Sequence, residues 1–404
     1  MKKKKVMIVA HFCGYGKETL NNRFNYLAER LADTGIEVEI LTSSFSHKDK
    51  KQRVEEKDLR KGYKSTLIYE PSYQKNVSFK RLLISHPTMA RNLGKYLLLS
   101  EKPDLIYCAI PSVDVATQAA RYARKWNIPF VLDVQDLWPE AYKLALKNGF
   151  LYKAVNAVLK KPADKVYGAA DKIVAVSETY AKRALSVNKK CQKALAVYLG
   201  TDVSTFDRNV KENKPLYYKP ENEFWLGYCG TLGHSYDLIT VMEAMKLSEE
   251  RGVRNLRLVV VGNGPLEERF KQKAAELDVQ CTFTGKLPYG QMCAQLVQCD
   301  VAVNPIVAES VASIINKHAD YAVAGLPVIN TQDSEEYRNL LMQYGCGINC
   351  EPGSVRQVAD AIEMLVQNTA LCEGMAEGSR KMGLEKFDRE NIYGDILKEL
   401  WSLL

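Results

Sequence analysis

The sequence lacks the patterns that mark several common functional classes. It has no apolar run of about 18 residues, the length that a membrane-spanning helix needs. It also lacks a GxxxxGK(S/T) phosphate loop, a GxSxG nucleophile turn and an Asp-x-Asp pair that could clamp a divalent cation. P-loop nucleotide hydrolases and α/β-hydrolases are therefore excluded. The aromatic and basic platform of a nucleic-acid reader is also missing, so no nucleic-acid partner is predicted.

Histidine and paired cysteine are scarce. The chain of 404 residues has five histidines, and none of its ten cysteines belongs to a CxxC pair. The closest two, Cys346 and Cys350, have no second pair and no histidines at zinc spacing, so neither a metal site nor a cofactor is predicted. Most cysteines lie in apolar runs, where they are typically small buried hydrophobes. This usage predicts a reduced, cytoplasmic protein.

Charge is unevenly distributed. Residues 1–200 hold 36 Lys and Arg against 19 Asp and Glu, a net charge of +17, whereas residues 201–404 hold 20 against 29, a net charge of −9. A basic half beside an acidic half indicates an anionic partner. The segment 78–104 mixes basic residues with leucines. It fits either a helix packed on its domain or a surface that docks on anionic lipid at the inner face of the plasma membrane.

Short apolar runs alternate with amphipathic segments along the chain. Such runs are typical of parallel strands buried on both faces, and their alternation with helices predicts βαβ units. The predicted strands are 6–10, 38–42, 65–69, 104–110, 130–134, 172–177 and 194–199, then "FWLGYCG", "LRLVVVG", "CTFTG", "VAVNP", "PVIN" and "GINC". The fold class is therefore α/β, with two doubly wound, Rossmann-like domains. Ligands of such sheets bind at the carboxyl ends of the strands, so the site is expected in a cleft between the domains.

Polar stretches divide the chain. Residues 203–222 contain two prolines and no periodicity, so we expect them to form the interdomain linker. The result is an N-terminal domain over 1–205 and a C-terminal domain over 206–386. A second polar stretch, 43–65, is predicted to be a mobile surface loop of the first domain.

Glycine turns follow the first strand of each domain. Gly14 and Gly16 in "HFCGYGKE" would let a ligand approach the backbone at a helix N-terminus, where free N–H groups favour anions. Gly230 and Gly233 in "GYCGTLGHSYD" repeat the arrangement and are followed by His234. The third glycine of a dinucleotide fingerprint is missing, which argues against NAD.

Two further stretches place polar side chains where chemistry is expected. In "FVLDVQDLWPEA", Gln135, Asp136 and Glu140 follow a strand, and Asp136 could serve a ligand or cap a helix. In "NKHADYAVAGLPVIN", Lys317 and Asp320 lie one helical turn apart, and Gly325 ends the helix. This pair fits a surface ion pair or a helix start aimed at a ligand with phosphate and hydroxyl groups.

Together these segments resemble the family-4 retaining glycosyltransferases of the GT-B fold. The segments, in family order, are "GYGKE", "VLDVQDLWPEA", "ADKIVAVSE", "YLGTD", "YCGTLG", "VVVGNGP", "FTGKLP", "CDVAVNP" and "NKHADYAVAGLPVIN". The resemblance covers essentially the full chain and is nearest to bacterial enzymes of capsule, exopolysaccharide and O-antigen assembly. It implies that a last helix, 387–404, crosses back to the first domain.

The resemblance implies a donor site. Asp320, where the family usually has Glu, would bind the ribose hydroxyls of a nucleotide sugar, and Lys317 would lie near the diphosphate. The implied donor-binding residues are Gly14, Gly16, Gly230, Gly233, His234, Asn263, Gly264, Asn304, Pro305, Asn316, Lys317 and Asp320.

The resemblance also implies an acceptor side. Its residues would be Gln135, Asp136, Trp138 and Glu140, with Gln135 and Asp136 standing where the family often has His-Asp. The implied catalytic residues are Asp136, Lys317 and Glu309.

Two other departures from the family pattern concern the donor side. Ala312 stands where the family has the first acid of a pair, and Glu309 or Ser310 would have to take its place. The Arg and Lys that commonly follow the glycine turn of the second domain are missing, so Lys317 and His234 would carry more of the leaving-group charge.

The implied activity is retaining, metal-independent glycosyl transfer. The donor would be a nucleotide-diphosphate sugar, UDP-linked, and the acceptor a glycan or lipid-linked molecule of bacterial surface polysaccharide synthesis. Front-face attack would require no protein nucleophile. Two other classes stay open. A UDP-sugar 2-epimerase shares the fold but would need a histidine cluster, and an inactive scaffold of a polysaccharide assembly complex would fit Ala312.

Overall fold

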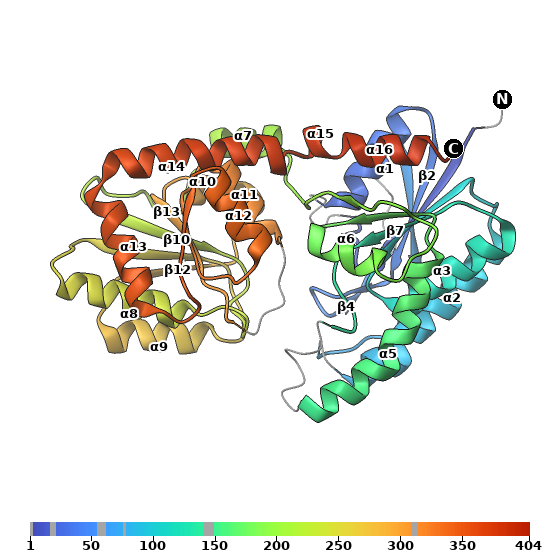
Figure 1. Ribbon diagram of the computed structural model, residues 1–404, viewed down its shortest axis with the longest axis horizontal. Coiled ribbons are helices and arrows are strands. Elements are labelled where there is room, and N and C mark those ends of the chain that lie inside the picture. The colour runs from blue at the N-terminus through green and yellow to red at the C-terminus, as the bar shows by residue number, and fades with distance from the viewer. Residues whose placement is uncertain (1–2, 17–21, 55–61, 76–77, 141–148, 309–313) are drawn as a thin grey trace. The chain divides into compact units, whose positions relative to one another are not determined.

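The computed structural model describes residues 3–16, 22–54, 62–75, 78–140, 149–308 and 314–404. The chain divides into two compact units (Figure 1). The first contains Met1–Tyr198 and Tyr393–Leu404, and the second contains Leu199–Ile392. Each unit is an α/β fold built on its own parallel sheet.

The first unit is built on a seven-stranded sheet in the order β5-β2-β1-β6-β7-β8-β9, in which every neighbouring pair is parallel. All side chains of β6 are buried, so this central strand is covered on both faces. The doubly wound arrangement predicted from the apolar runs is therefore confirmed. The strands are β1 (Lys5–Val9), β2 (Glu37–Ser43), β5 (Tyr63–Ile68), β6 (Leu105–Ile110), β7 (Phe130–Val134), β8 (Lys172–Ala175) and β9 (Leu195–Ala196).

Helices connect these strands. The segment 78–104 forms a π-helical turn that runs directly into a longer α-helix. The helices of this unit are α1 (Arg23–Asp33), η1 (Lys80–Ser85), α2 (His86–Leu99), α3 (Val113–Trp126), α5 (Gly149–Ala169), α6 (Glu178–Leu185) and α16 (Gly394–Trp401). The return of the chain to this unit is visible at Tyr393, whose ring lies edge-on to that of Tyr26 in α1 with 5.4 Å between centroids.

The second unit is built on a six-stranded parallel sheet in the order β12-β11-β10-β13-β14-β15. The strands are β10 (Phe224–Cys229), β11 (Leu256–Val261), β12 (Cys281–Gly285), β13 (Val301–Asn304), β14 (Val328–Asn330) and β15 (Gly347–Asn349). The helices are α7 (Val203–Glu212), α8 (Leu238–Glu250), α9 (Glu267–Leu277), α10 (Tyr289–Leu296), α11 (Asn316–Val323), α12 (Glu335–Gln343), α13 (Val355–Gln367), α14 (Thr369–Met382), η2 (Gly383–Phe387) and α15 (Arg389–Ile392).

In both sheets the order in which strands are added reverses beside the first strand of the unit. β1 lies between β2 and β6, and β10 lies between β11 and β13. In open α/β sheets, ligands bind at such switch points, outside the carboxyl ends of the strands. The glycine turns that follow β1 and β10 occupy this position in the two units.

Three expectations about irregular segments were wrong. The predicted linker 203–222 begins with helix α7 (Val203–Glu212), which belongs to the second unit. The predicted loop 43–65 contains a short antiparallel hairpin of β3 (Phe45–Ser46) and β4 (Lys51–Gln52), while 55–61 lie outside the described residues. The last segment, 387–404, is not one helix, because η2, α15 and α16 follow one another with breaks at Asp388 and Tyr393.

None of the helices that the structure describes is long and apolar enough to cross a bilayer.

Candidate active site

Lys317 is a buried cation at the start of α11. Its side chain is 7% exposed, and its Nζ lies 4.1 Å from the ring centroid of Tyr228 and 3.8 Å from that of Tyr236. Among the described residues, Nζ has no hydrogen-bond partner. The two aromatic faces attract the cation, but they do not replace the hydrogen bonds that an ammonium makes in water.

Gly230 brings the backbone close to this cation. Its φ of +144° is in a region that side chains rarely adopt, and a Cβ there would lie 3.2 Å from Lys317 Nζ. Burial lowers the pKa of Lys317 to about 7. An anion beside Nζ would satisfy its N–H groups and restore its charge, so Lys317 and the Gly230 turn form an anion-binding arrangement.

Asp320 lies one turn further along α11. Its Oδ1 accepts a hydrogen bond from the Tyr289 hydroxyl at 3.2 Å, and that hydroxyl lies 2.9 Å from the Thr201 hydroxyl. Burial raises the pKa of Asp320 to about 6, against the effects of the Tyr289 hydrogen bond and the positive charge of Arg389. Asp320, the residue predicted to bind the ribose hydroxyls, is therefore held in a fixed position by Tyr289. Sequence reasoning did not find Tyr289 and Thr201, because no spacing pattern connects them to Asp320.

The other predicted donor residues of the second unit lie at the Gly230 turn and at the ends of neighbouring elements. Gly264 packs on the Gly230 turn, since a Cβ at this position would lie 2.4 Å from the Leu232 carbonyl oxygen. The Asn263 carbonyl accepts the Leu232 N–H at 3.0 Å. The remaining ones lie at the turn and at two element ends: Gly233 and exposed His234 follow Gly230, Pro305 follows β13, and Asn316 begins α11.

Asn304 belongs to a buried amide network. Its Nδ2 donates to Asn330 Oδ1 at 2.8 Å and to Gln332 Oε1 at 3.1 Å, and Asn330 donates to Asn349 Oδ1 at 2.8 Å. Asn304, Asn330 and Asn349 are in register on β13, β14 and β15. Asn304 thus supports the carboxyl edge of the sheet, and its predicted contact with the donor stays a prediction. Glu309 lies outside the described residues.

In the first unit, Asp136 is the centre of the predicted acceptor turn. It accepts hydrogen bonds from the Leu137 N–H at 2.9 Å, Trp138 Nε1 at 3.2 Å and the Tyr180 hydroxyl at 3.4 Å. Burial raises the pKa of Asp136 despite these bonds. The backbone N–H of Gln135 donates to the Ile110 carbonyl, while its side-chain Nε2 is buried without a partner in the described parts of the chain.

Glu140 differs from this group. Its Oε1 lies 2.6 Å from Arg183 Nε, and Arg183 also binds Asp164 at 2.6 Å. This ion pair gives Glu140 a structural partner of its own.

Gly14 and Gly16 follow β1, and Gly16 has the left-handed φ of +58° that its tight turn requires. The predicted meeting of these residues with the second unit in one cleft stays a prediction.

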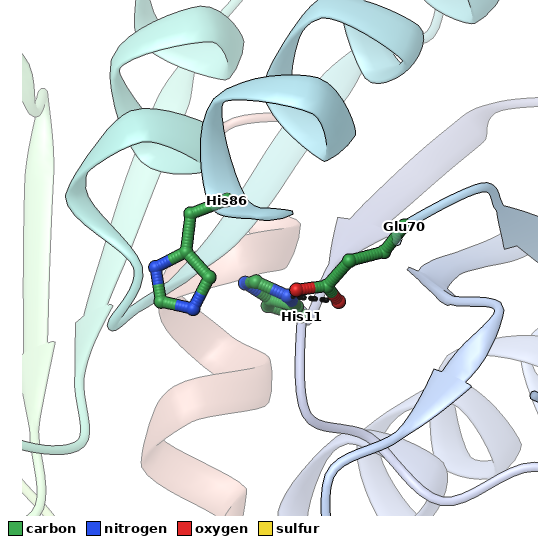
Figure 2. A group of neighbouring side chains, drawn as sticks. All are labelled: His11, Glu70 and His86. Carbon is green, nitrogen blue, oxygen red and sulfur yellow. Dashed lines mark hydrogen bonds and ion pairs between the residues drawn. The ribbon is translucent and has the colours of Figure 1, made fainter. Parts of the chain in front are cut away.

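A buried polar cluster in the first unit was not predicted from the sequence. His11 Nε2 lies 2.7 Å from Glu70 Oε2 (Figure 2). The Nδ1 of His11 lies 2.9 Å from Ser112 Oγ. The His86 ring is 4.9 Å from the His11 ring. Burial alone would raise the pKa of Glu70, but the charge of His11 and hydrogen bonds from His11, Ser43 and Ser85 lower it to about 2.

The proximity of His11, Glu70 and His86 is compatible with a metal site, but their partners are not. Ser43 and Ser85 donate to the Glu70 carboxylate, and Arg81 Nε donates to His86 Nε2 at 3.1 Å. A guanidinium bound to a ligand atom would repel a cation. The cluster is therefore best described as a buried, hydrogen-bonded His11–Glu70 pair with His86 beside it.

Family models match most of the chain. Residues 19–195 match the glycosyl transferase 4-like domain, and residues 209–382 match glycosyl transferases group 1. No curated protein sequence matches.

Several solved structures share the fold over the full length. Sucrose-phosphate synthase from Thermosynechococcus elongatus is 15% identical with a TM-score of 0.71, covering 100% of both chains. Anabaena HepE in complex with UDP is 13% identical with a TM-score of 0.69, covering 99% of this chain and 100% of that one. WaaG, a glycosyltransferase involved in lipopolysaccharide biosynthesis, is 16% identical with a TM-score of 0.65, covering 96% and 98%.

The fold and both matches agree with the resemblance drawn from the short motifs. The two units correspond to the two matched domains, each a Rossmann-like sheet. The chain belongs to the GT-B glycosyltransferases, with a glycosyl transferase 4-like domain followed by a glycosyl transferases group 1 domain.

Proposed function

We propose that this glycosyltransferase is a retaining, metal-independent enzyme that uses a UDP-linked sugar donor. The observation that carries the proposal is the unpartnered Lys317 ammonium beside the Gly230 turn, one helical turn from the Asp320 carboxylate. A nucleoside diphosphate has the matching groups, because its diphosphate is anionic and its ribose offers two hydroxyls. HepE has been solved in complex with UDP and in complex with UDP-glucose, which favours UDP as the nucleotide here.

In this proposal Lys317 stabilises the charge that develops on the leaving diphosphate. The bond between the sugar's C1 and the phosphate oxygen breaks, and a bond from the acceptor hydroxyl oxygen to C1 forms on the same face. The acceptor proton passes to the leaving phosphate oxygen, so no protein nucleophile takes part. A fixed cation placed where charge develops is worth about 10²- to 10³-fold in kcat.

On the acceptor side, Asp136 is proposed to orient a hydroxyl of the sugar or the acceptor, beside Gln135 and Trp138. Its raised pKa fits a carboxyl group in a largely desolvated place. The acceptor itself is proposed to be a glycan or lipid-linked molecule of bacterial surface polysaccharide synthesis, and the site of action to be the cytoplasmic side of the membrane.

The test is binding and turnover with matched variants. Thermal shifts with UDP, GDP and ADP in EDTA should show stabilisation by UDP, which Lys317→Gln and Asp320→Ala lose and the exposed-lysine control Lys381→Gln keeps. UDP-sugars should then be transferred by the wild type with retention at C1. Stabilisation by no nucleotide would contradict the proposal. Epimerised UDP-sugar without acceptor would favour the epimerase, and binding without turnover would favour the scaffold.

A further inference from the structure

An apolar groove of about 560 Å³ opens in the first unit between η1, α2, α3 and α5. Apart from His86 and Asp114, its lining residues are apolar and include Leu82, Val113 and Leu159. Its volume is in the range of small-molecule sites, which is about 300–1,000 Å³. The groove is not required by the transfer chemistry described above.

The mouth of the groove exposes large apolar side chains. Phe79 is 83% exposed, Leu83 is 70% exposed and Val158 is 71% exposed, and all three line the groove. A concentration of exposed apolar side chains marks a surface that meets something apolar. Lys80 on η1 and Lys161 on α5 are also exposed, so exposed positive charge lies on two of the helices that form the groove.

The inner end of the groove reaches the acceptor turn. Trp138 lines the groove, and its Nε1 donates to Asp136. His86 stacks on the Trp138 ring with 5.7 Å between centroids and an interplanar angle of 21°. Burial and the positive charges of His11 and Arg81 lower the pKa of His86 to about 2, so this imidazole is neutral. The inner end therefore presents two neutral rings, which suit a hydrocarbon chain.

We propose that this groove holds the hydrocarbon chain of a lipid-linked acceptor whose linking phosphate faces Lys80 and Lys161. An anionic amphiphile satisfies both the apolar lining and the exposed positive charge. A second copy of the chain fits less well, because residues 1–200 carry a net charge of +17 and like charges repel. The inference rests on the proposed function, in which the Asp136 turn binds the acceptor. The groove adds that the acceptor is lipid-linked and not a free glycan.

The test uses farnesyl phosphate and inorganic phosphate as probes in calorimetric titrations of the full chain. Val113→Trp fills the groove and Leu83→Glu places a charge at its mouth, whereas Leu99→Glu is the matched control on α2. Leu99 is 89% exposed and does not line the groove. The wild type and Leu99→Glu should bind farnesyl phosphate but not inorganic phosphate. The two groove variants should bind it about tenfold or more weakly, because they exclude methylene groups from the groove.

Thermal stabilisation by UDP, measured on the same samples, separates this inference from the proposed function. Stabilisation by UDP without binding of farnesyl phosphate would overturn the groove alone. Equal affinity in Val113→Trp and the wild type would also overturn it. Vesicles of phosphatidylcholine and phosphatidylglycerol test a membrane contact. If Leu83→Glu loses binding to these vesicles and Val113→Trp keeps it, the surface contacts the membrane and the groove holds no chain. A dimer in sedimentation equilibrium that Leu83→Glu dissociates would show a second copy instead.

Discussion

At the scale of single residues, Lys317 and Asp320 have pKa values shifted in opposite directions within one turn of α11. Burial lowers the pKa of Lys317 to about 7 and raises that of Asp320 to about 6. The charged forms of both groups are needed for a ligand with phosphates and ribose hydroxyls. In the free protein both groups are therefore charged only between about pH 6 and 7. A bound diphosphate stabilises the protonated form of Lys317 and extends this range to higher pH.

The affinity for UDP-glucose should therefore have a pH optimum. Below about pH 6 Asp320 is protonated and becomes a weaker hydrogen-bond acceptor, and above about pH 7 Lys317 loses its proton unless the diphosphate retains it. UDP-glucose is the suitable ligand because its diphosphate diester does not titrate in this range. Calorimetry from pH 5 to 9 measures the two limbs. Asp320→Asn should flatten the acid limb and Lys317→Gln the alkaline limb, whereas an unchanged profile in both variants would contradict these roles.

Tyr289 should act as a positioning residue for Asp320. Its hydrogen bond lowers the pKa of the carboxyl group, so Tyr289→Phe should move the acid limb of UDP-glucose binding to higher pH and weaken affinity about three- to tenfold. Tyr344→Phe is a matched control, because Tyr344 donates to Glu385 in the same unit at 2.7 Å. A loss of affinity without movement of the acid limb would show that Tyr289 only supports the fold.

At the scale of elements, the strands were predictable and the short or polar elements were not. The run "LIYCAI" became β6 because six consecutive apolar side chains are buried between two helical layers. Helix α11 ended as predicted, because Gly325 takes a left-handed φ of +70°. The hairpin of β3 and β4 has two residues in each strand, which is too short for a period of two to appear in the sequence.

Helix α7 was missed because a polar stretch with two prolines directly follows it. Val203, Phe206 and Val210 recur at helical spacing, although only the first two are buried. A start signal was nevertheless present: Asp202 is the N-cap and its Oδ1 accepts the Thr205 N–H at 2.8 Å. The buried polar cluster shows the same limit, since His11, Glu70 and His86 are brought together by the fold from three distant positions. The sequence predicted Lys317 and Asp320 because they share one helix.

The cap of α7 gives a prediction at this scale. Asp202→Ala should lower the free energy of unfolding of the second unit by about 1 kcal/mol, because the first turn of α7 loses a hydrogen-bond acceptor. Asp202→Asn keeps an acceptor at the same position and should cost only a few tenths of that. Urea unfolding followed by circular dichroism measures both. Equal losses in the two variants would mean that the charge of Asp202, rather than its capping, matters.

At the scale of the whole molecule, one buried ion pair connects the two separate chain segments of the first unit. Arg23 Nη1 lies 2.9 Å from Asp133 Oδ1, and Tyr107 donates to Asp133 Oδ2 at 2.7 Å. Arg23 Nε donates to the Tyr393 hydroxyl at 3.2 Å and its Nη2 donates to the Tyr198 carbonyl at 3.0 Å. The guanidinium therefore joins α1, β7 and the points where the chain leaves and re-enters this unit.

Arg23→Ala should destabilise the first unit by about 3–5 kcal/mol, because Asp133 would remain buried without its partner. Stabilisation by UDP should persist, since the proposed donor site lies in the second unit. The control is Arg30→Ala on the same helix, whose side chain is 51% exposed and whose ion pair with Asp33 is worth less than about 1 kcal/mol. Differential scanning calorimetry with and without UDP measures the change. Loss of the UDP effect in Arg23→Ala would show that the units do not behave independently.

The return of the chain at Tyr393 also sets an order for events during protein synthesis. Domains usually fold from the N-terminus as they leave the ribosome. Here Arg23 and Asp133 are made early, but Tyr393 is made only after all of Leu199–Ile392. All residues of the second unit are therefore synthesised before the last segment of the first unit. Until Tyr393 is made, the ion pair of Arg23 and Asp133 lacks its contact with this segment.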